Sequence, residues 1–143
     1  NCWRSSTLTW GSQVKQGIVG SCIITSVSDT IHHLLEEELK SSLPEYDKLE
    51  CQYYIWQPQS GISWHNDKEP DRLFGSTLYL NDEWYPDFGG WFIWEDNDGH
   101  HAILPKKKFL VVNDNYQNHC VTPVSVGFRC TIQIWGKKYP AKI

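Results

Sequence analysis

LFGSTLYLNDEWYPDFGGWFIWE, residues 73–95, is the stretch that decides the fold of this chain. In its first part, residues 73–81, the polar positions 77, 79 and 81 alternate with Leu78 and Leu80, which predicts a strand. Asp87-Phe88-Gly89-Gly90 then supplies a turn. The aromatic run at 91–95 predicts a second strand. The centre of the chain is therefore predicted to form a strand, a turn and a second strand.

The pattern continues on both sides of this stretch. Further strands are expected at 50–56, 101–104, 108–113, 119–122 and 128–135. One helix precedes them, with apolar residues at helical spacing from Val27 to Leu39, a cap at Ser28 or Asp29, and an end at Leu43-Pro44. A helix followed by many short strands predicts a mainly β fold, a β-sandwich or jelly roll, with one N-terminal helix packed on a sheet.

Length and composition set the class of protein. The chain has 143 residues, 40% apolar and 21% charged, which fits one globular domain covering 1–143. A net charge of −4 argues against a general nucleic-acid binder. No apolar run approaches the roughly 20 residues of a membrane span. Five cysteines without CxxC spacing favour reduced thiols, and we expect a cytoplasmic protein.

Three residues have the chemistry of a metal site. His65 and Asp67 are two residues apart, so on an extended stretch both side chains point to the same side. A second histidine, His119, follows a turn and opens a strand. Two imidazoles and one carboxylate form the facial triad of non-haem Fe(II), which leaves three coordination positions open.

A buried cation is expected near that site. Arg129 lies ten residues after His119, and Thr131 follows on the same face of the predicted strand. An arginine inside a sheet needs an acidic partner, and the planar guanidinium suits a carboxylate that arrives with a ligand.

These residues, in this order and spacing, resemble the signature of Fe(II)/2-oxoglutarate-dependent oxygenases, in the prolyl 4-hydroxylase-like branch. The resemblance runs from Tyr53 to Trp135. It includes the strand that ends in Tyr79-Leu80-Asn81, the Gly89-Gly90 pair, and the His-x-Val-x-Pro-Val form at 119–124. The compact form is similar to small versions found in phages and marine microbes.

The resemblance implies a double-stranded β-helix and a set of roles. His65, Asp67 and His119 would be the catalytic Fe(II) ligands, and Arg129, Thr131 and Tyr79 would bind 2-oxoglutarate as cosubstrate. With O2, the implied reaction hydroxylates a second substrate, peptidyl proline by family default, and releases succinate and CO2. Relatives that halogenate have a small residue in place of Asp67, so hydroxylation is expected.

Two other functions stay open. Nucleic-acid demethylases share this layout but carry a second arginine where this chain has Trp135. A non-catalytic β-sandwich could instead stack sugars on tryptophans such as Trp64, Trp84 and Trp94. We expect a peptide or small-molecule substrate at the loop 68–74, with no membrane partner and nucleic acid disfavoured. The stretch at 53–58 matches the family pattern only loosely, which leaves open whether Tyr53, Tyr54 or Trp56 faces the site.

Overall fold

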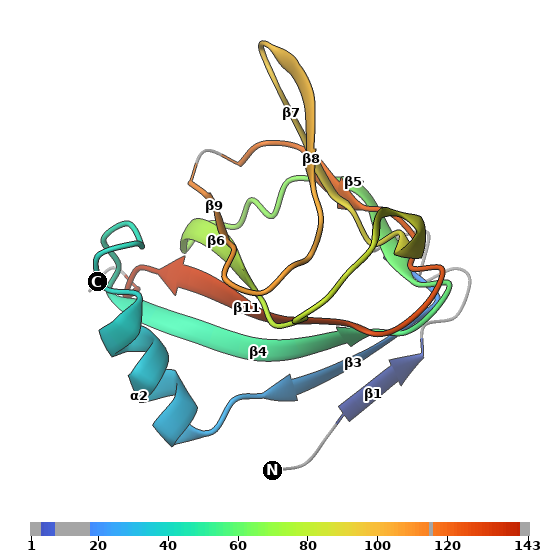
Figure 1. Ribbon diagram of the computed structural model, residues 1–143. Helices are drawn as coiled ribbons and strands as arrows, with labels where there is room; N and C mark the ends of the chain where they lie inside the picture. Colours follow the sequence, from blue (N-terminus) through green and yellow to red (C-terminus); the bar gives the residue numbers. More distant parts are fainter. Residues whose placement is uncertain (1–3, 8–17, 115, 141–143) are drawn as a thin grey trace.

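Two antiparallel sheets face each other, and one helix covers the outer face of the larger sheet (Figure 1). The computed structural model describes residues 4–7, 18–114 and 116–140. The six-stranded sheet has the order β1 (Arg4–Thr7), β3 (Ser21–Ser26), β4 (Lys48–Trp56), β11 (Arg129–Lys137), β6 (Arg72–Tyr79) and β9 (Leu110–Asn113). The five-stranded sheet has the order β2 (Ile18–Val19), β5 (Gly61–His65), β10 (His119–Val121), β7 (Phe92–Asp96) and β8 (Gly99–Ile103). The expected mainly β jelly roll with one helix is confirmed.

The helix α2 (Asp29–Glu38) begins where the sequence predicts. The Ser28 hydroxyl accepts a hydrogen bond from the Ile31 N–H at 3.2 Å, so Ser28 is the N-cap. The helix ends at Glu38, earlier than expected, because the chain turns after it. The N–H groups of Ser42 and Leu43 both donate to the Leu39 carbonyl in this turn.

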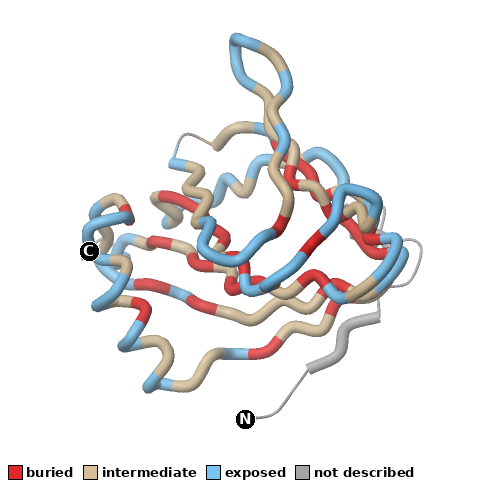
Figure 2. The backbone as a smooth tube through the Cα atoms, in the orientation of Figure 1, coloured by how far each residue is buried: buried red, intermediate tan, exposed pale blue. Residues whose placement is uncertain are grey.

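The two faces of β11 divide the interior into a core and a cavity. Ile132 and Ile134 face the helix and join a buried apolar cluster with Leu35 and Phe74. Arg129, Thr131, Gln133 and Trp135 face the other sheet and line a cavity. Figure 2 shows that buried residues occur along strands of both sheets and that exposed residues follow the outer loops. Alternation along one strand thus separates the structural core from the candidate site.

The seven predicted strands all have a counterpart, and four further strands, β1, β2, β3 and β5, were not predicted. β9 begins at Leu110 rather than 108 because Lys108 has a φ of 77°, which turns the chain out of the sheet. β6 ends at Tyr79 rather than 81. Asn81 leaves the ladder and bridges the chain near β11, donating to the Phe128 carbonyl and accepting from the Cys130 N–H.

The Gly89-Gly90 turn lies against the segment between β10 and β11, where Gly89 forms an isolated bridge with Val124. Gly89 and Gly90 have φ of 70° and 66°, the left-handed region that favours glycine. A Cβ on Gly89 would also collide with the Pro123 carbonyl oxygen. The short helix η1 (Pro86–Phe88) leads into this turn. Within the described part of the chain, no helix is long and apolar enough to cross a membrane.

Candidate active site

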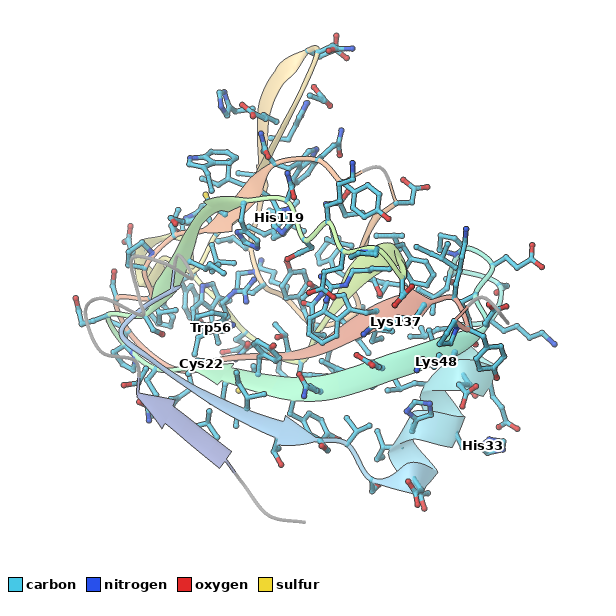
Figure 3. All side chains as sticks on the ribbon, turned by 180° about the vertical axis from the view of Figure 1, so that it is seen from behind. Cys22, His33, Lys48, Trp56, His119 and Lys137 are labelled. Carbon is cyan, nitrogen blue, oxygen red and sulfur yellow. The ribbon has the colours of Figure 1, made fainter. Side chains whose placement is uncertain are left out.

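A cavity of about 140 Å³ lies between the two sheets, and most of the predicted site residues line it. At about 30 Å³ per water, this volume would hold roughly five waters, the scale of a small organic acid. His65, Asp67, His119, Arg129 and Thr131 all contribute to its wall. Figure 3 shows His119 between the sheets, whereas His33 lies on the helix and away from the cavity.

His65, Asp67 and His119 meet at one end of the cavity. The His65 Nε2 is 3.3 Å from the Asp67 Oδ1, and the His119 Nε2 is 3.0 Å from the Asp67 Oδ2. His65 ends β5 and pairs with His119 of β10 across the sheet. Asp67 lies two residues beyond the end of β5 and turns back toward both imidazoles. The predicted convergence of His65 and Asp67 therefore occurs at a strand end.

Backbone carbonyls fix both imidazoles in one orientation. The His65 Nδ1 lies 2.7 Å from the Ser63 carbonyl oxygen, and the His119 Nδ1 lies 2.8 Å from that of Gln117. A carbonyl only accepts, so each Nδ1 carries a proton, and each Nε2 is the ring nitrogen that faces Asp67. Asn113 supports the second histidine, because its amide also bonds the Gln117 N–H and C=O at 3.1 Å.

The charges of the three groups are coupled. Burial raises the pKa of Asp67, but hydrogen bonds from His119 and His65 outweigh it and hold the pKa well below its usual range. Burial lowers the pKa of His65, but the contacts with Asp67 and the Ser63 carbonyl outweigh it and raise the pKa. The carboxylate is therefore ionised at neutral pH and attracts positive charge at this point.

Arg129 lies deeper in the cavity and has an unused donor. Its side chain is 2% exposed, and its Nε donates to the Gly90 carbonyl at 3.0 Å. Its Nη2 is buried and has no hydrogen-bond partner among the described residues. Burial lowers the pKa of Arg129. A buried guanidinium without a carboxylate is costly, so an anionic ligand bound here would stabilise it.

Tyr79 and Thr131 lie side by side next to Arg129. The two residues are cross-strand partners in β6 and β11, and both are buried. The guanidinium carbon of Arg129 is 5.3 Å from the centre of the Tyr79 ring. The Tyr79 hydroxyl has no hydrogen-bond partner in the described structure. Tyr79 is 1% exposed, which excludes the outer surface, although Thr131 and not Tyr79 lines the cavity directly.

A second pair of unused donors lies near Asp67. The Arg72 guanidinium stacks over the Trp135 ring at 5.0 Å, and its Nη1 donates to the Asp67 carbonyl at 2.7 Å. The Arg72 Nε and the Trp135 Nε1 are both buried and lack partners in the described chain. Glu69 pairs with the Arg72 Nη2 at 3.1 Å. Two buried N–H donors near Asp67 thus have no acceptor among the described residues.

The structure also settles several residues that the sequence left open. Tyr54 and Trp56 line the cavity, whereas Tyr53 packs on the helix side. Trp84 is buried in the core and donates to the Gly89 carbonyl, so it does not line a groove. Trp64 is 47% exposed on β5. Sequence reasoning missed Asn113 and Arg72, whose roles depend on tertiary contacts.

The donor set fits a divalent cation. The ligand atoms of His65, Asp67 and His119 all lie within 4.8 Å of one another. Metal–ligand distances of about 2.1 Å at right angles put neighbouring ligand atoms about 3 Å apart, close to the separations here. The unpartnered Arg129 Nη2 and Tyr79 hydroxyl likewise fit a carboxylate bound deeper in the cavity.

A comparison with models of protein families identifies the family of this chain. A model described as the 2OG-Fe(II) oxygenase superfamily matches residues 49–137, which is more than half of the chain. This chain belongs to the 2OG-Fe(II) oxygenase superfamily. The matched range includes both histidines, Asp67 and Arg129. No curated protein matches the chain.

Solved structures share the fold at low sequence identity. A Pseudomonas putida prolyl-4-hydroxylase has 22% identity and a TM-score of 0.72, with 90% of this chain and 75% of that one covered. A Trichoplax adhaerens prolyl hydroxylase, in complex with a hypoxia inducible factor oxygen degradation domain peptide fragment, has 22% identity and a TM-score of 0.70, with 81% and 62% covered. A Burkholderia pseudomallei 2OG-Fe(II) oxygenase family protein has 17% identity and a TM-score of 0.67, with 82% and 66% covered. The chain therefore spans 62–75% of the length of these three structures and shares their fold.

Proposed function

We propose that this chain is an Fe(II)- and 2-oxoglutarate-dependent dioxygenase that hydroxylates a peptidyl proline and releases succinate and CO2. One observation carries the proposal. A histidine–aspartate–histidine cluster and a buried arginine with an unpartnered nitrogen share a single cavity. The cluster suits a divalent cation, and the arginine suits the far carboxylate of a small dicarboxylic acid.

In this proposal His65, Asp67 and His119 hold the metal. Bound Fe(II) supplies the redox chemistry by which O2 converts 2-oxoglutarate to succinate and CO2 and hydroxylates the second substrate. The Ser63 and Gln117 carbonyls keep each imidazole aimed at the metal position through its Nδ1. Asp67 supplies the negative charge, which favours a divalent cation over a neutral ligand.

Arg129, Tyr79 and Thr131 would bind the cosubstrate. The Arg129 Nη2 and the Tyr79 hydroxyl are buried donors without partners, and a carboxylate would satisfy both. Thr131 adds a hydroxyl on the same side of β11. The hydrogen bond from the Arg129 Nε to Gly90 fixes the direction of the guanidinium before the ligand binds.

Peptidyl proline is proposed as the substrate on three supports. The fold is shared with prolyl hydroxylases, one of them in complex with a peptide fragment. The Arg72 Nε and the Trp135 Nε1 are unpartnered donors near Asp67, and peptide carbonyls are acceptors. Glu69 already balances the charge of Arg72, which favours a neutral acceptor over an anion.

The free thiols of Cys22, Cys51, Cys120 and Cys130 support a reducing, cytoplasmic setting.

A succinate assay tests the proposal. The Fe(II)-loaded protein is given 2-oxoglutarate, O2 and one compound at a time from a panel of prolyl peptides, free amino acids and nucleotides. We expect succinate formation above the substrate-free rate with at least one prolyl peptide, together with a mass increase of one oxygen atom. Asp67→Ala is the inactive control. Stimulation by nucleotides alone would favour the demethylase function, and no stimulation by any peptide would contradict the proposal.

A further inference from the structure

The strand β9 has a free edge beside the candidate active site. It is the last strand of the six-stranded sheet, and among the described residues β6 is its only paired neighbour. Figure 1 shows this order from β4 through β11 and β6 to β9. A strand edge without a neighbour presents unpaired backbone groups that another extended chain can bind.

Alternation identifies the backbone groups on that edge. The Tyr79 N–H donates to the Phe109 carbonyl at 3.1 Å, so this residue pair is a hydrogen-bonded one. In an antiparallel ladder every second residue then bonds to the partner strand, which assigns Val111 to β6. The N–H and C=O of Leu110 and Val112 therefore point outward, and we call these groups the β9 edge. No loop or side chain of the described chain bonds to them.

A side pocket of about 160 Å³ opens along the same strand. It is lined by Phe92, Trp94, Val111, Val112, Asn113 and Gln117. Phe92, Val111 and Asn113 also line the cavity that holds the histidine–aspartate cluster. The side pocket therefore adjoins the candidate active site. A chain extended along the β9 edge would pass both.

We propose that the substrate is an extended peptide that adds as a strand to the β9 edge and places a flanking side chain in the side pocket. This inference rests on the proposed function, which supplies the peptide. Backbone hydrogen bonds from Leu110 and Val112 would provide affinity without regard to sequence, and the side pocket would provide specificity. The residue to be hydroxylated would then enter the shared cavity between the sheets.

The lining of the side pocket defines which flanking side chain it takes. Four of its six residues are apolar or aromatic, and the other two are the amides Asn113 and Gln117. Trp94 stacks on His101 of β8 with ring centres 5.2 Å apart, and this contact holds the indole in place. No lining side chain carries a formal charge. A leucine or phenylalanine therefore fits the side pocket, whereas a glutamate would lose its hydration without gaining a partner.

Amide hydrogen exchange tests the docking site directly and does not depend on turnover. The protein is loaded with Mn(II) and 2-oxoglutarate and mixed in turn with each prolyl peptide of the panel used in the succinate assay. Binding should slow exchange at the Leu110 and Val112 amides by at least about tenfold, because each would gain a hydrogen bond. The Val111 amide already lies in the ladder and serves as the internal control. A bound peptide that leaves both edge amides unchanged would overturn the inference.

Two further comparisons test the docking site, one with a pair of Val112 variants and one with pairs of peptides. Val112→Pro removes an outward N–H without removing a ladder hydrogen bond, and it should weaken peptide binding at least about tenfold while leaving 2-oxoglutarate affinity unchanged. Val112→Thr keeps the shape and the N–H, and it should bind within about threefold of the wild type. The second comparison uses the wild-type protein and pairs of peptides that differ only in having leucine or glutamate at one flanking position. Each flanking position is tested in turn. At the position that enters the side pocket, kcat/KM should be roughly 10–200-fold higher for the leucine peptide.

The outcomes separate this inference from the proposed function. Turnover of a peptide without protection of the β9 edge, or with equal tolerance of leucine and glutamate at every position, overturns the docking site and leaves the hydroxylase intact. Protection of the edge without succinate formation supports the docking site and contradicts the hydroxylase. A panel in which no peptide binds overturns both.

Discussion

Replacing Arg129 by methionine separates cosubstrate binding from folding and from metal binding. The guanidinium is 2% exposed, donates one hydrogen bond to Gly90, and leaves its Nη2 unpartnered. Methionine has a similar volume and removes a buried charge that no described residue compensates. The ligand-free protein should therefore be as stable as the wild type or more stable, because an uncompensated buried charge opposes folding.

The effect on 2-oxoglutarate should be large. Deleting one partner of a buried charge pair costs about 2–5 kcal/mol, which corresponds to roughly 30- to several-thousand-fold in affinity. Arg129→Lys should lie between the wild type and Arg129→Met, because the ammonium keeps the charge but loses the planar fork. Mn(II) affinity should stay within about threefold, because Arg129 is not one of the three groups that meet at the metal position.

Calorimetry with 2-oxoglutarate on the Mn(II)-loaded variants measures these affinities, and thermal melts of the ligand-free proteins measure stability. Arg72→Met is the matched control, since it makes the same substitution near Asp67 and should leave 2-oxoglutarate affinity within about threefold. An unchanged affinity in Arg129→Met, or a large loss only in Arg72→Met, would refute the assignment of the cosubstrate to the Arg129 end.

Five further substitutions probe other parts of the site. Alanine at His65, Asp67 or His119 should remove most Mn(II) affinity by calorimetry and leave the circular dichroism spectrum unchanged, because only three protein ligands meet there; three unchanged affinities would contradict the metal site. Tyr79→Phe should raise the 2-oxoglutarate requirement by roughly 10- to 150-fold without lowering the melting temperature, because the lost hydroxyl is unpartnered in the free protein; a large drop in melting temperature would instead assign Tyr79 to the core. Gly90→Ala should lower the melting temperature by about 3–8 °C, since its φ is 66°, and should weaken 2-oxoglutarate binding, since a Cβ there would lie 3.1 Å from the Arg129 Cδ; a variant that matches the wild type in both would refute this role.

Sequence patterns predicted the strands whose two faces differ sharply. β11 alternates between Ile132 or Ile134 on the helix side and polar or aromatic residues on the cavity side, so both its existence and its faces were predictable. β5 was missed because it is short, follows a turn, and exposes Trp64. Local sequence gives little signal for such a strand, and its place between β2 and β10 comes from pairing with distant residues.

Some residues of the candidate site could likewise be predicted from the sequence, and others could not. His65, Asp67, His119 and Arg129 were predictable because their residue types and order are specific to one kind of chemistry. Asn113 holds the loop before His119, and Arg72 stacks on Trp135 across the sheet. Their roles depend on contacts between segments far apart in the sequence, and either residue alone reads as an ordinary surface side chain.

An anaerobic optical titration tests the central claim, that this cavity holds Fe(II) and 2-oxoglutarate together. Fe(II)-loaded protein is titrated with 2-oxoglutarate in the absence of O2, and the visible spectrum is recorded. We predict the weak charge-transfer band of a 2-oxo acid chelated to Fe(II), which Arg129→Met shifts to higher 2-oxoglutarate concentration and His119→Ala abolishes. A spectrum that stays unchanged while calorimetry shows both ligands bound would contradict the claim, as would the same band in His119→Ala.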